Sequence, residues 1–182
     1  NTLNVLAYEF RSNNPDTAIY FASQARALAI KMNYKWGIAN AYLIIGIALR
    51  NLGNNEKALK NSIDALTIFE QLLLKAAGTE KPADKSKILK QIAGVDNSIG
   101  IIYVTQGNYI EALKNHFTAL KTREEIGDKQ GKATSYNNIG NVYVAQGNYP
   151  AALKNYLASL KIFEETGNKQ FIACCYVNIG RI

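Results

Sequence analysis

Hydrophobic and polar positions alternate along the chain with the spacing of amphipathic helices. One apolar stripe recurs at positions i, i+3, i+4 and i+7, which share a face of an α-helix, and it consists of Tyr136, Ile139, Gly140 and Tyr143. A second stripe follows after a short turn and consists of Ala152, Tyr156, Ser159, Leu160 and Phe163. The pattern therefore predicts two consecutive helices that pack through their apolar faces.

This helix pair is repeated along the chain. Residues 43–67, 97–121 and 137–161 align without gaps, and successive copies are marked by Gly46, Gly100, Gly140 and Gly180. The markers are spaced by 54, 40 and 40, which indicates a period of 40 with one insertion of 14. Ala7, close to one period before Gly46, marks a first, divergent copy. The fifth copy is cut short, so we expect the chain to be a fragment of a longer protein.

Turn residues mark the ends of the predicted helices. In the fourth copy, Gly147 can adopt the positive φ that ends the first helix. Asn148 is a favourable N-cap residue, and Pro150 falls in the first helical turn, where its missing N–H costs little. The second helix should end at a residue that tolerates the left-handed conformation, and in successive copies this residue is Asn33, Gly127 or Gly167.

These features resemble the tetratricopeptide repeat family along essentially the whole chain. The family signature is a small residue followed by an aromatic three later, an alanine twelve later and an aromatic sixteen later, as in Gly140, Tyr143, Ala152 and Tyr156. The period of 40 and the segment EEIGDKQGKATSYNNIGNVY resemble a subgroup that includes kinesin light chains, Pins-type adaptors, Rap regulators and sensory segments of bacterial signalling proteins. The sequence departs from the pattern at Arg26, Asn33, Ser62 and His116.

The resemblance implies an all-α fold, a right-handed superhelical solenoid of antiparallel helix pairs. One pair cannot bury its apolar faces alone, so neighbouring pairs stack around a continuous core. We expect a single solenoid over residues 1–182, with repeats at about 1–34, 35–82, 83–128, 129–168 and a truncated fifth at 169–182. First helices are expected near 2–12, 35–52, 83–106, 129–146 and 170–182. Second helices are expected near 15–31, 55–76, 109–126 and 149–166.

The insertion lies between Phe69 and Gly100. Fourteen residues make about four helical turns, so the simplest arrangement adds two turns to each flanking helix and places the turn near residues 78–82. The extension would be held together by Leu72, Leu73, Ile88 and Ile92. Its charged residues are Lys75, Lys81, Lys85, Lys87 and Lys90, set against Glu80 and Asp84. Two interpretations remain open: a docking protrusion for an acidic partner, and a solvated hairpin.

Composition adds little to this picture. The formal net charge of +7 slightly favours an acidic protein partner, but the lysines are spread along the chain, so nucleic-acid binding is not expected. No apolar run approaches the roughly 20 residues that span a membrane. Cys174 and Cys175 are adjacent, and no CxxC or Cys/His metal spacing occurs. This cysteine usage favours a reducing, cytoplasmic compartment.

Motifs for catalysis or cofactors are missing from the sequence. His116 is the only histidine and has no neighbouring nucleophile or carboxylate in the pattern, so a polar residue in a packing position is the favoured interpretation. Neither GxxxxGK[ST] nor GxGxxG occurs. The carboxylate pairs Glu124-Glu125 and Glu164-Glu165 do not face each other on a helix, because adjacent residues point in different directions. We therefore expect a non-enzymatic protein without a cofactor or metal.

The resemblance implies that the first helices of the repeats line a concave groove that binds peptides or helical segments. Several positions of each first helix are expected to face the groove. One of them is the second residue before each marker glycine, and it is occupied by Ile44, Ser98, Asn138 and Asn178. The candidate binding residues are Arg50, Asn97, Asn137, Asn138, Asn141, Asn178 and Arg181. An asparagine amide both donates and accepts, so it can pair with a peptide backbone of any sequence. Solvated amides, or amides bonded within their own helix, are the equally weighted alternative.

The leading functional hypothesis is therefore a protein–protein interaction scaffold. The alternative is a regulatory or sensory segment of a larger signalling protein, such as a histidine kinase, nucleotide cyclase or transcriptional regulator, whose output domain lies outside this chain. Because the fifth repeat lacks its second helix, the apolar stripe of its first helix should either fray or pair with another chain. Such pairing would be an artefact of truncation.

Overall fold

The computed structural model describes residues 2–76 and 82–182. Over these residues it contains nine α-helices and no strand. Their bounds are α1 Thr2–Phe10, α2 Pro15–Lys31, α3 Lys35–Asn51, α4 Asn55–Ala76, α5 Pro82–Thr105, α6 Tyr109–Glu125, α7 Lys129–Ala145, α8 Tyr149–Thr166 and α9 Lys169–Ile179. The predicted helix positions agree with these bounds to within a few residues, and the predicted solenoid fold is confirmed.

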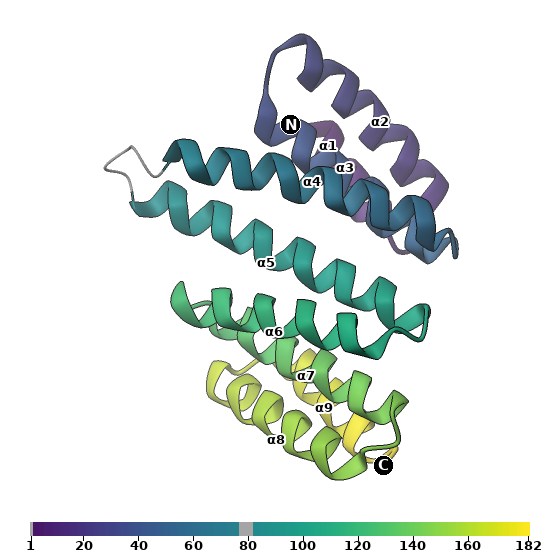
Figure 1. Ribbon diagram of the computed structural model, residues 1–182, viewed down its shortest axis with the longest axis vertical. Helices are drawn as coiled ribbons and strands as arrows, with labels where there is room; N and C mark the ends of the chain where they lie inside the picture. The colour runs from purple at the N-terminus through teal and green to yellow at the C-terminus, as the bar shows by residue number, and fades with distance from the viewer. Residues whose placement is uncertain (1, 77–81) are drawn as a thin grey trace.

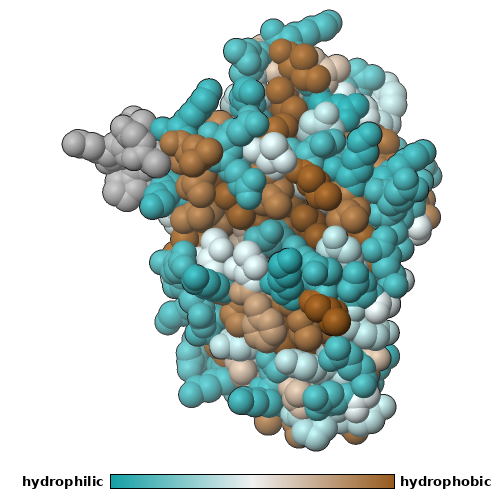
Figure 2. Space-filling model, viewed as in Figure 1, coloured by the Kyte–Doolittle hydropathy of each residue, from teal (hydrophilic) through white to brown (hydrophobic). Residues whose placement is uncertain are grey.

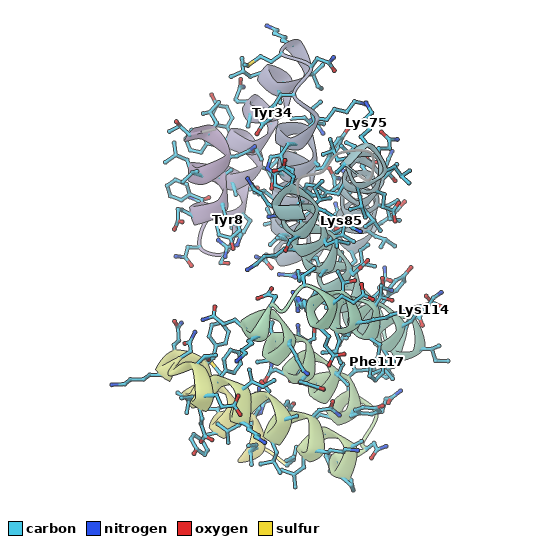
Figure 3. All side chains as sticks on the ribbon, turned by 90° about the vertical axis from the view of Figure 1, so that its left-hand side faces the viewer. Tyr8, Tyr34, Lys75, Lys85, Lys114 and Phe117 are labelled. Atoms are coloured by element: carbon cyan, nitrogen blue, oxygen red, sulfur yellow. The ribbon has the colours of Figure 1, made fainter. Side chains whose placement is uncertain are left out.

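The helices stack in chain order along the long axis of the molecule (Figure 1). Odd-numbered helices form one layer and α2, α4, α6 and α8 form the other. Seen from the side, the stack is curved (Figure 3). Tyr8 of α1 lies on the hollow side, whereas Lys114 and Phe117 of α6 lie on the opposite, outer side. The odd-numbered helices are called the inner helices below, and the even-numbered helices the outer helices.

Helix ends follow the predicted turn chemistry. Gly147 and Gly167 have φ values of 73° and 69°, which a side chain would strain, and Asn33 is the one non-glycine residue among the described ones with positive φ, at 51°. The Asn148 side chain accepts a hydrogen bond of 3.2 Å from the backbone N–H of Ala151. The sequence signals for these boundaries were therefore correct.

The marker glycines allow each inner helix to approach the outer helix of its own pair. A Cβ on Gly140 would lie 2.5 Å from the ring of Tyr156, which is 2% exposed. A Cβ on Gly100 would lie 2.7 Å from the His116 ring, and one on Gly46 would lie 2.8 Å from the Ser62 hydroxyl. His116 is 1% exposed, so it occupies a packing position as predicted.

The insertion lengthens two helices, as predicted. Helix α4 has 22 residues and α5 has 24, compared with 17 in α3, α6 and α7. In Figure 1, α5 projects beyond α6. Ile88 and Ile92 are buried beside Phe69, with Leu72 and Leu73 packed against them. Glu80, Lys81 and most of the predicted turn lie outside the described residues.

Trp36 joins this cluster through a T-shaped contact with Phe69, at 5.3 Å between ring centroids. The Lys87 ammonium lies 4.9 Å from the centroid of the Trp36 ring, a cation–π contact. Trp36 therefore contacts its own repeat through Phe69 and the next repeat through Lys87. None of the helices in the described residues is long and apolar enough to cross a membrane.

Candidate binding groove

The depressions that border the inner helices include the following three. One of about 390 Å³ lies between α1, α3 and α5, and its lining includes Tyr8, Trp36, Leu43 and Gln91. Another, of about 410 Å³, lies between α7 and α9 and includes Thr134, Asn137, Cys174 and Asn178. A third, of about 340 Å³, includes Asn141, Tyr156, Asn178 and Arg181. Four of the seven predicted binding residues, Asn137, Asn141, Asn178 and Arg181, thus line depressions.

The asparagines do not form a simple row of free amides, because several bond to one another across neighbouring inner helices. The Asn138 Nδ2 on α7 donates to the Asn97 Oδ1 on α5 at 2.8 Å. One repeat later, the Asn178 Nδ2 on α9 donates to the Asn137 Oδ1 on α7, also at 2.8 Å. The two bridges are equivalent, since Asn97 and Asn137 stand three residues before their markers and Asn138 and Asn178 stand two before theirs.

One set of positions expected to face the groove also lies at a helix contact. The position two residues before the marker is little exposed, at 4% for Ile44 and 8% for Ser98, although Ile44 lines the depression between α1, α3 and α5. The physical reason is that this position lies at the contact between successive inner helices, where the donor asparagines Asn138 and Asn178 also bond. The alternative of amides bonded within their own helix does not hold for these asparagines, because both bridges link different helices.

Two further bonds connect candidate residues to the outer helices. The Tyr156 hydroxyl donates to the Asn141 Oδ1 at 2.7 Å, and the His116 Nδ1 donates to the Asn97 Oδ1 at 3.1 Å. Burial, with a smaller contribution from the Arg123 charge, lowers the pKa of His116 to about 4, so the ring is neutral at pH 7. Replacing Asn97 or Asn141 by alanine would therefore strip a partner from a buried or half-buried group and cost stability.

Part of each amide stays available to a ligand. Within the described residues, the Nδ2 groups of Asn97, Asn137 and Asn141 make no hydrogen bond, and neither do the Oδ1 atoms of Asn138 and Asn178. Asn141 is exposed, and the other four are partly buried. The groove wall of the C-terminal half thus offers both donors and acceptors, which is what pairing with a peptide backbone requires.

The two predicted arginines lie in different repeats, Arg50 in the last turn of α3 and Arg181 just after α9. The Arg50 guanidinium on α3 donates to the Asn51 Oδ1 at 3.0 Å, and the Asn51 Nδ2 donates to the backbone oxygen of Arg11 at 2.8 Å. Partial burial lowers the pKa of Arg50. No carboxylate in the described residues forms an ion pair with it. Arg181 is exposed beside Tyr156. Both guanidinium groups could therefore bind an anionic group of a ligand.

A buried charge cluster at the centre of the molecule was not predicted. Arg123 of α6 is 8% exposed and donates to the Gly131 backbone oxygen at 2.9 Å and to the Ser135 Oγ at 2.7 Å. Asp96 of α5 is 5% exposed, and its Oδ2 has no partner among the described residues. Burial and the nearby charge of Glu70 raise the pKa of Asp96 to about 7, although Arg123 opposes the shift.

One signal in the sequence pointed to this cluster. Counted from its marker glycine, Arg123 occupies the place that Phe69 and Phe163 occupy in the neighbouring copies. Both phenylalanines are buried, at 0% and 1% exposure. An arginine at a repeat position where two other copies have a core phenylalanine indicates a buried charge, and a buried charge needs polar partners. Metal-ligand chemistry has no comparable signal: no group of three histidine, cysteine, aspartate or glutamate side chains gathers in residues 2–76 and 82–182.

Comparison with known proteins identifies the class. A profile described as Tetratricopeptide repeat matches residues 91–165 and 131–182, which together cover half of the chain. The chain belongs to the tetratricopeptide repeat family, whose fold typically serves as a non-catalytic scaffold for protein–protein interaction. No curated protein sequence matches it.

Solved structures share the fold at low sequence identity. A Rap protein in complex with competence and sporulation factor superposes with a TM-score of 0.76 and 20% identity, over 98% of this chain and 52% of the Rap chain. A STAND signal-transduction ATPase with a tetratricopeptide repeat sensor, from Pyrococcus horikoshii, gives 0.70 and 18%, over 97% and 26% of the two chains. A putative kinesin light chain from Podospora anserina gives 0.64 and 14%, over 99% and 86%. The chain therefore spans about half of the Rap protein and a quarter of the ATPase.

Proposed function

We propose that this chain is a protein-interaction module that binds a peptide or helical segment of a partner along the groove of its inner helices. The residues proposed to contact the segment are Arg50, Asn97, Asn137, Asn138, Asn141, Asn178 and Arg181. The single domain over residues 1–182, with its five repeats, is the unit proposed to form that groove.

The observation that carries the proposal is the arrangement of half-used amides. In each Asn–Asn bridge one amide group binds the neighbouring helix and fixes the side chain, while the other group has no partner among the described residues. A side chain held in place loses less conformational entropy when it binds a ligand. Exposed donors and acceptors that recur at the repeat period suit a ligand backbone that is itself regular. The Rap protein complexed with competence and sporulation factor is an example of ligand binding by a protein with a similar fold.

The experiment should remove groove donors without breaking the bridges. Asn137→Asp with Asn141→Asp keeps the oxygens that accept from Asn178 and Tyr156 but deletes both unpaired Nδ2 donors. Peptides enriched from a random-peptide display library on the wild-type protein are then titrated against this double variant by fluorescence anisotropy. Loss of at least tenfold in affinity for a set of these peptides is expected.

A matched control carries the same change in charge at sites away from the groove. Asn54→Asp with Asn108→Asp leaves the N-cap bonds to Lys57 and Glu111 possible, since aspartate caps helices as well as asparagine does. Affinity should stay within twofold of wild type. If every selected peptide binds both double variants equally, the amides of Asn137 and Asn141 do not contact the ligand and the groove proposal fails.

A second candidate, a sensory segment of a larger signalling protein, is favoured by one finding. The solved relatives include a STAND signal-transduction ATPase with a tetratricopeptide repeat sensor, of which the matched portion is about a quarter. Such a segment would pass a ligand-induced change in curvature to an output domain. The sequence of the complete gene tests this directly, because an adjoining kinase, cyclase, ATPase or DNA-binding domain is required.

A further inference from the structure

The outer helices carry an exposed apolar residue at the same position in three successive repeats. Ile63, Phe117 and Leu157 lie on α4, α6 and α8, each at the same place counted from the marker glycine of its repeat. They are 46%, 45% and 49% exposed, which is nearly uniform. Single exposed apolar residues are common and need no explanation. Three exposed apolar residues at the repeat period on successive outer helices form a regularly spaced feature of the surface, here called the outer row.

Core packing does not explain the outer row. The contacts within each helix pair are made by other residues of the same outer helices, such as Ala112 and His116 on α6 and Ala152 and Tyr156 on α8, all nearly inaccessible to solvent. Phe117 and Leu157, one residue further along, point away from these contacts. Figure 3 shows Phe117 on the outer side of α6, opposite the hollow side where Tyr8 lies.

Lysines accompany the outer row with the same period. Lys60, Lys114 and Lys154 precede the three apolar residues by three positions, and Lys121 and Lys161 follow Phe117 and Leu157 by four. Residues three and four apart share a helix face. All five lysines are exposed. Of these five lysines, only Lys114 forms an ion pair with another described residue, namely Glu111 on its own helix at 3.4 Å.

Together these residues make a face that is apolar along its middle and basic along both sides. Figure 2 views the molecule from this side and shows hydrophobic patches separated by hydrophilic ones over the outer helices. Figure 3 shows Lys114 and Phe117 close together at the outer edge of the same helix. Charge complementarity calls for a ligand with carboxylates beside aliphatic or aromatic groups.

We propose that the outer row, with its flanking lysines, docks an acidic amphipathic segment of a second protein that lies across α4, α6 and α8. This surface is separate from the groove of the inner helices, so the inference does not depend on the proposed function. The partner's apolar side chains would cover Ile63, Phe117 and Leu157. Its aspartates and glutamates would pair with the lysines, which gives the docking register and a dependence on salt.

A protein segment fits this face better than an anionic membrane does. Membrane-binding faces insert apolar side chains about 5–10 Å into the headgroup boundary. Half of the surface of each outer-row side chain is already covered by its neighbours. Such side chains can be overlaid by a ligand that follows the surface, but they do not project far enough to enter a bilayer.

The test uses selection with two baits. A random-peptide display library is enriched on the wild-type protein, and peptides are kept that fail to bind the variant Phe117→Ser with Leu157→Ser. We expect the kept peptides to be rich in glutamate or aspartate interspersed with leucine, isoleucine or phenylalanine. Anisotropy titrations of these peptides should show at least a tenfold loss of affinity for Lys114→Glu with Lys154→Glu, and a further loss of wild-type binding as salt is raised.

Matched controls separate location from charge and hydrophobicity. Lys129→Glu with Lys169→Glu makes the same change in net charge at exposed first residues of α7 and α9, and Ile30→Ser with Leu52→Ser removes two comparably exposed apolar side chains. Both should bind within twofold of wild type. Circular dichroism and thermal melts should show that every variant is folded, and Phe117→Tyr, which keeps the ring, serves as a second probe if the serine variant melts early.

Three outcomes would overturn the proposal. The first is a selection that yields no acidic peptide dependent on Phe117 and Leu157. The second is an equal loss of affinity in the Lys129/Lys169 control, which would mean that net charge alone attracts the peptides. The third is sedimentation of the protein with phosphatidylserine vesicles, lost in the Phe117/Leu157 variant, together with no peptide binding at that face. That result would assign the outer row to a membrane.

Discussion

The inner helices are joined differently in the two halves of the molecule. Between α5, α7 and α9 the contact is made by Asn97–Asn138 and Asn137–Asn178 hydrogen bonds. Between α1, α3 and α5 the equivalent pairs are Asn4 with Ile44 and Leu43 with Ser98. The same contact between inner helices is therefore filled by amide pairs in one half and by one apolar and one polar side chain per pair in the other.

The difference shows how one fold changes its surface chemistry without changing its architecture. Amide bridges have directional requirements, so they fix the register of neighbouring helices and leave polar groups exposed beside them. Apolar contacts gain energy from burial alone. Amide side chains line both parts of the groove: Asn4, Asn40 and Gln91 stand beside Tyr8, Trp36 and Leu43 in the N-terminal part, and Asn141 and Asn178 line the C-terminal part. The halves differ in that pairs of amide side chains bridge neighbouring inner helices only in the C-terminal half of the described residues.

The N-terminal half leaves three buried polar atoms without a partner among the described residues, namely the Asn4 Oδ1, the Asn55 Oδ1 and the Ser62 Oγ. The counterparts of Asn4 and Ser62 in the other half, at Asn97, His116 and Tyr156, are all bonded. The Asn4 Nδ2 donates to the Gly37 backbone oxygen at 3.2 Å, but its Oδ1 faces no amide donor because Ile44 stands where Asn138 and Asn178 stand in later repeats.

The largest expected effect is the loss of stability when a marker glycine is replaced, and it should differ between Gly140 in the C-terminal half and Gly46 in the N-terminal half. Gly140→Leu should destabilise the protein by about 3 kcal/mol or more, because even the first carbon of the new side chain would meet the rigid, buried Tyr156 ring. Gly46→Ala should cost clearly less than Gly140→Ala, since the small Ser62 hydroxyl can rotate away. Urea unfolding measures all three.

Gly94→Ala is the control for these substitutions. Gly94 lies within α5, and an added Cβ would meet no atom within 4 Å. The alanine should stabilise the protein by about 0.5–1 kcal/mol through helix propensity. Equal costs for alanine at positions 46 and 140 would show that the two halves do not differ at this contact.

Regular features of this fold could be predicted from the sequence, and irregular ones could not. Local periodicity predicts the helices, the glycine and asparagine residues at their ends and the extended α4–α5 hairpin. The same local pattern recurs in every repeat, so each copy supports the prediction made from the others. The Asn97–Asn138 bridge spans 41 residues, one more than the period, because it joins different positions of neighbouring repeats. Such an offset depends on how adjacent helices pack, and a comparison of equivalent positions does not reveal it.

The Asp96–Arg123 cluster was missed for the opposite reason. It occurs once, so repetition gives it no support, and its stability depends on the burial and charges that α4, α5 and α6 create together. The groove residues stand between these cases. Their alignment along the inner helices was predictable, whereas their partners, Tyr156 for Asn141 and His116 for Asn97, required the packed structure.

An effect of intermediate size is the pH dependence of the free energy of unfolding that Asp96 causes in the cluster between the two halves. Burial raises the pKa of Asp96 to about 7, above its value of about 3.9 in an unfolded chain. The folded state therefore binds the extra proton, and the contribution of Asp96 to stability is present below pH 4 and is lost as pH rises through 7. Asp96→Asn should match wild type near pH 4 and exceed it in free energy of unfolding by about 1–3 kcal/mol at pH 8.

His116 has the opposite sign and masks part of this slope in the wild type. Its pKa is lowered to about 4, so its contribution is present above pH 6.5 and is lost as pH falls toward 4. The informative quantity is thus the difference between wild type and Asp96→Asn at each pH, measured by urea unfolding. Asp84→Asn removes an exposed carboxylate from the same helix and should show no such trend. A variant less stable than wild type at pH 8 would mean that attraction to Arg123 outweighs burial.

The smallest expected effect would transplant an amide bridge into the N-terminal half. Ile44→Asn places a donor where Asn138 and Asn178 stand in later repeats, opposite the unpaired Asn4 Oδ1. The substitution alone should still destabilise the protein, because Ile44 packs with Ala7, Ala22 and Ile45.

The energy of the new bridge can be separated from this cost as the coupling free energy between positions 4 and 44. The measurement is therefore a double-mutant cycle that combines Ile44→Asn with Asn4→Ala. We expect a favourable coupling of about 0.5–1.5 kcal/mol, the net value of one hydrogen bond. Ile44→Ala in the same cycle, which offers no donor, should show none. A coupling of zero for asparagine would mean that α1 and α3 lie in a register that amides cannot bridge, and that the two halves differ in backbone geometry as well as in side chains.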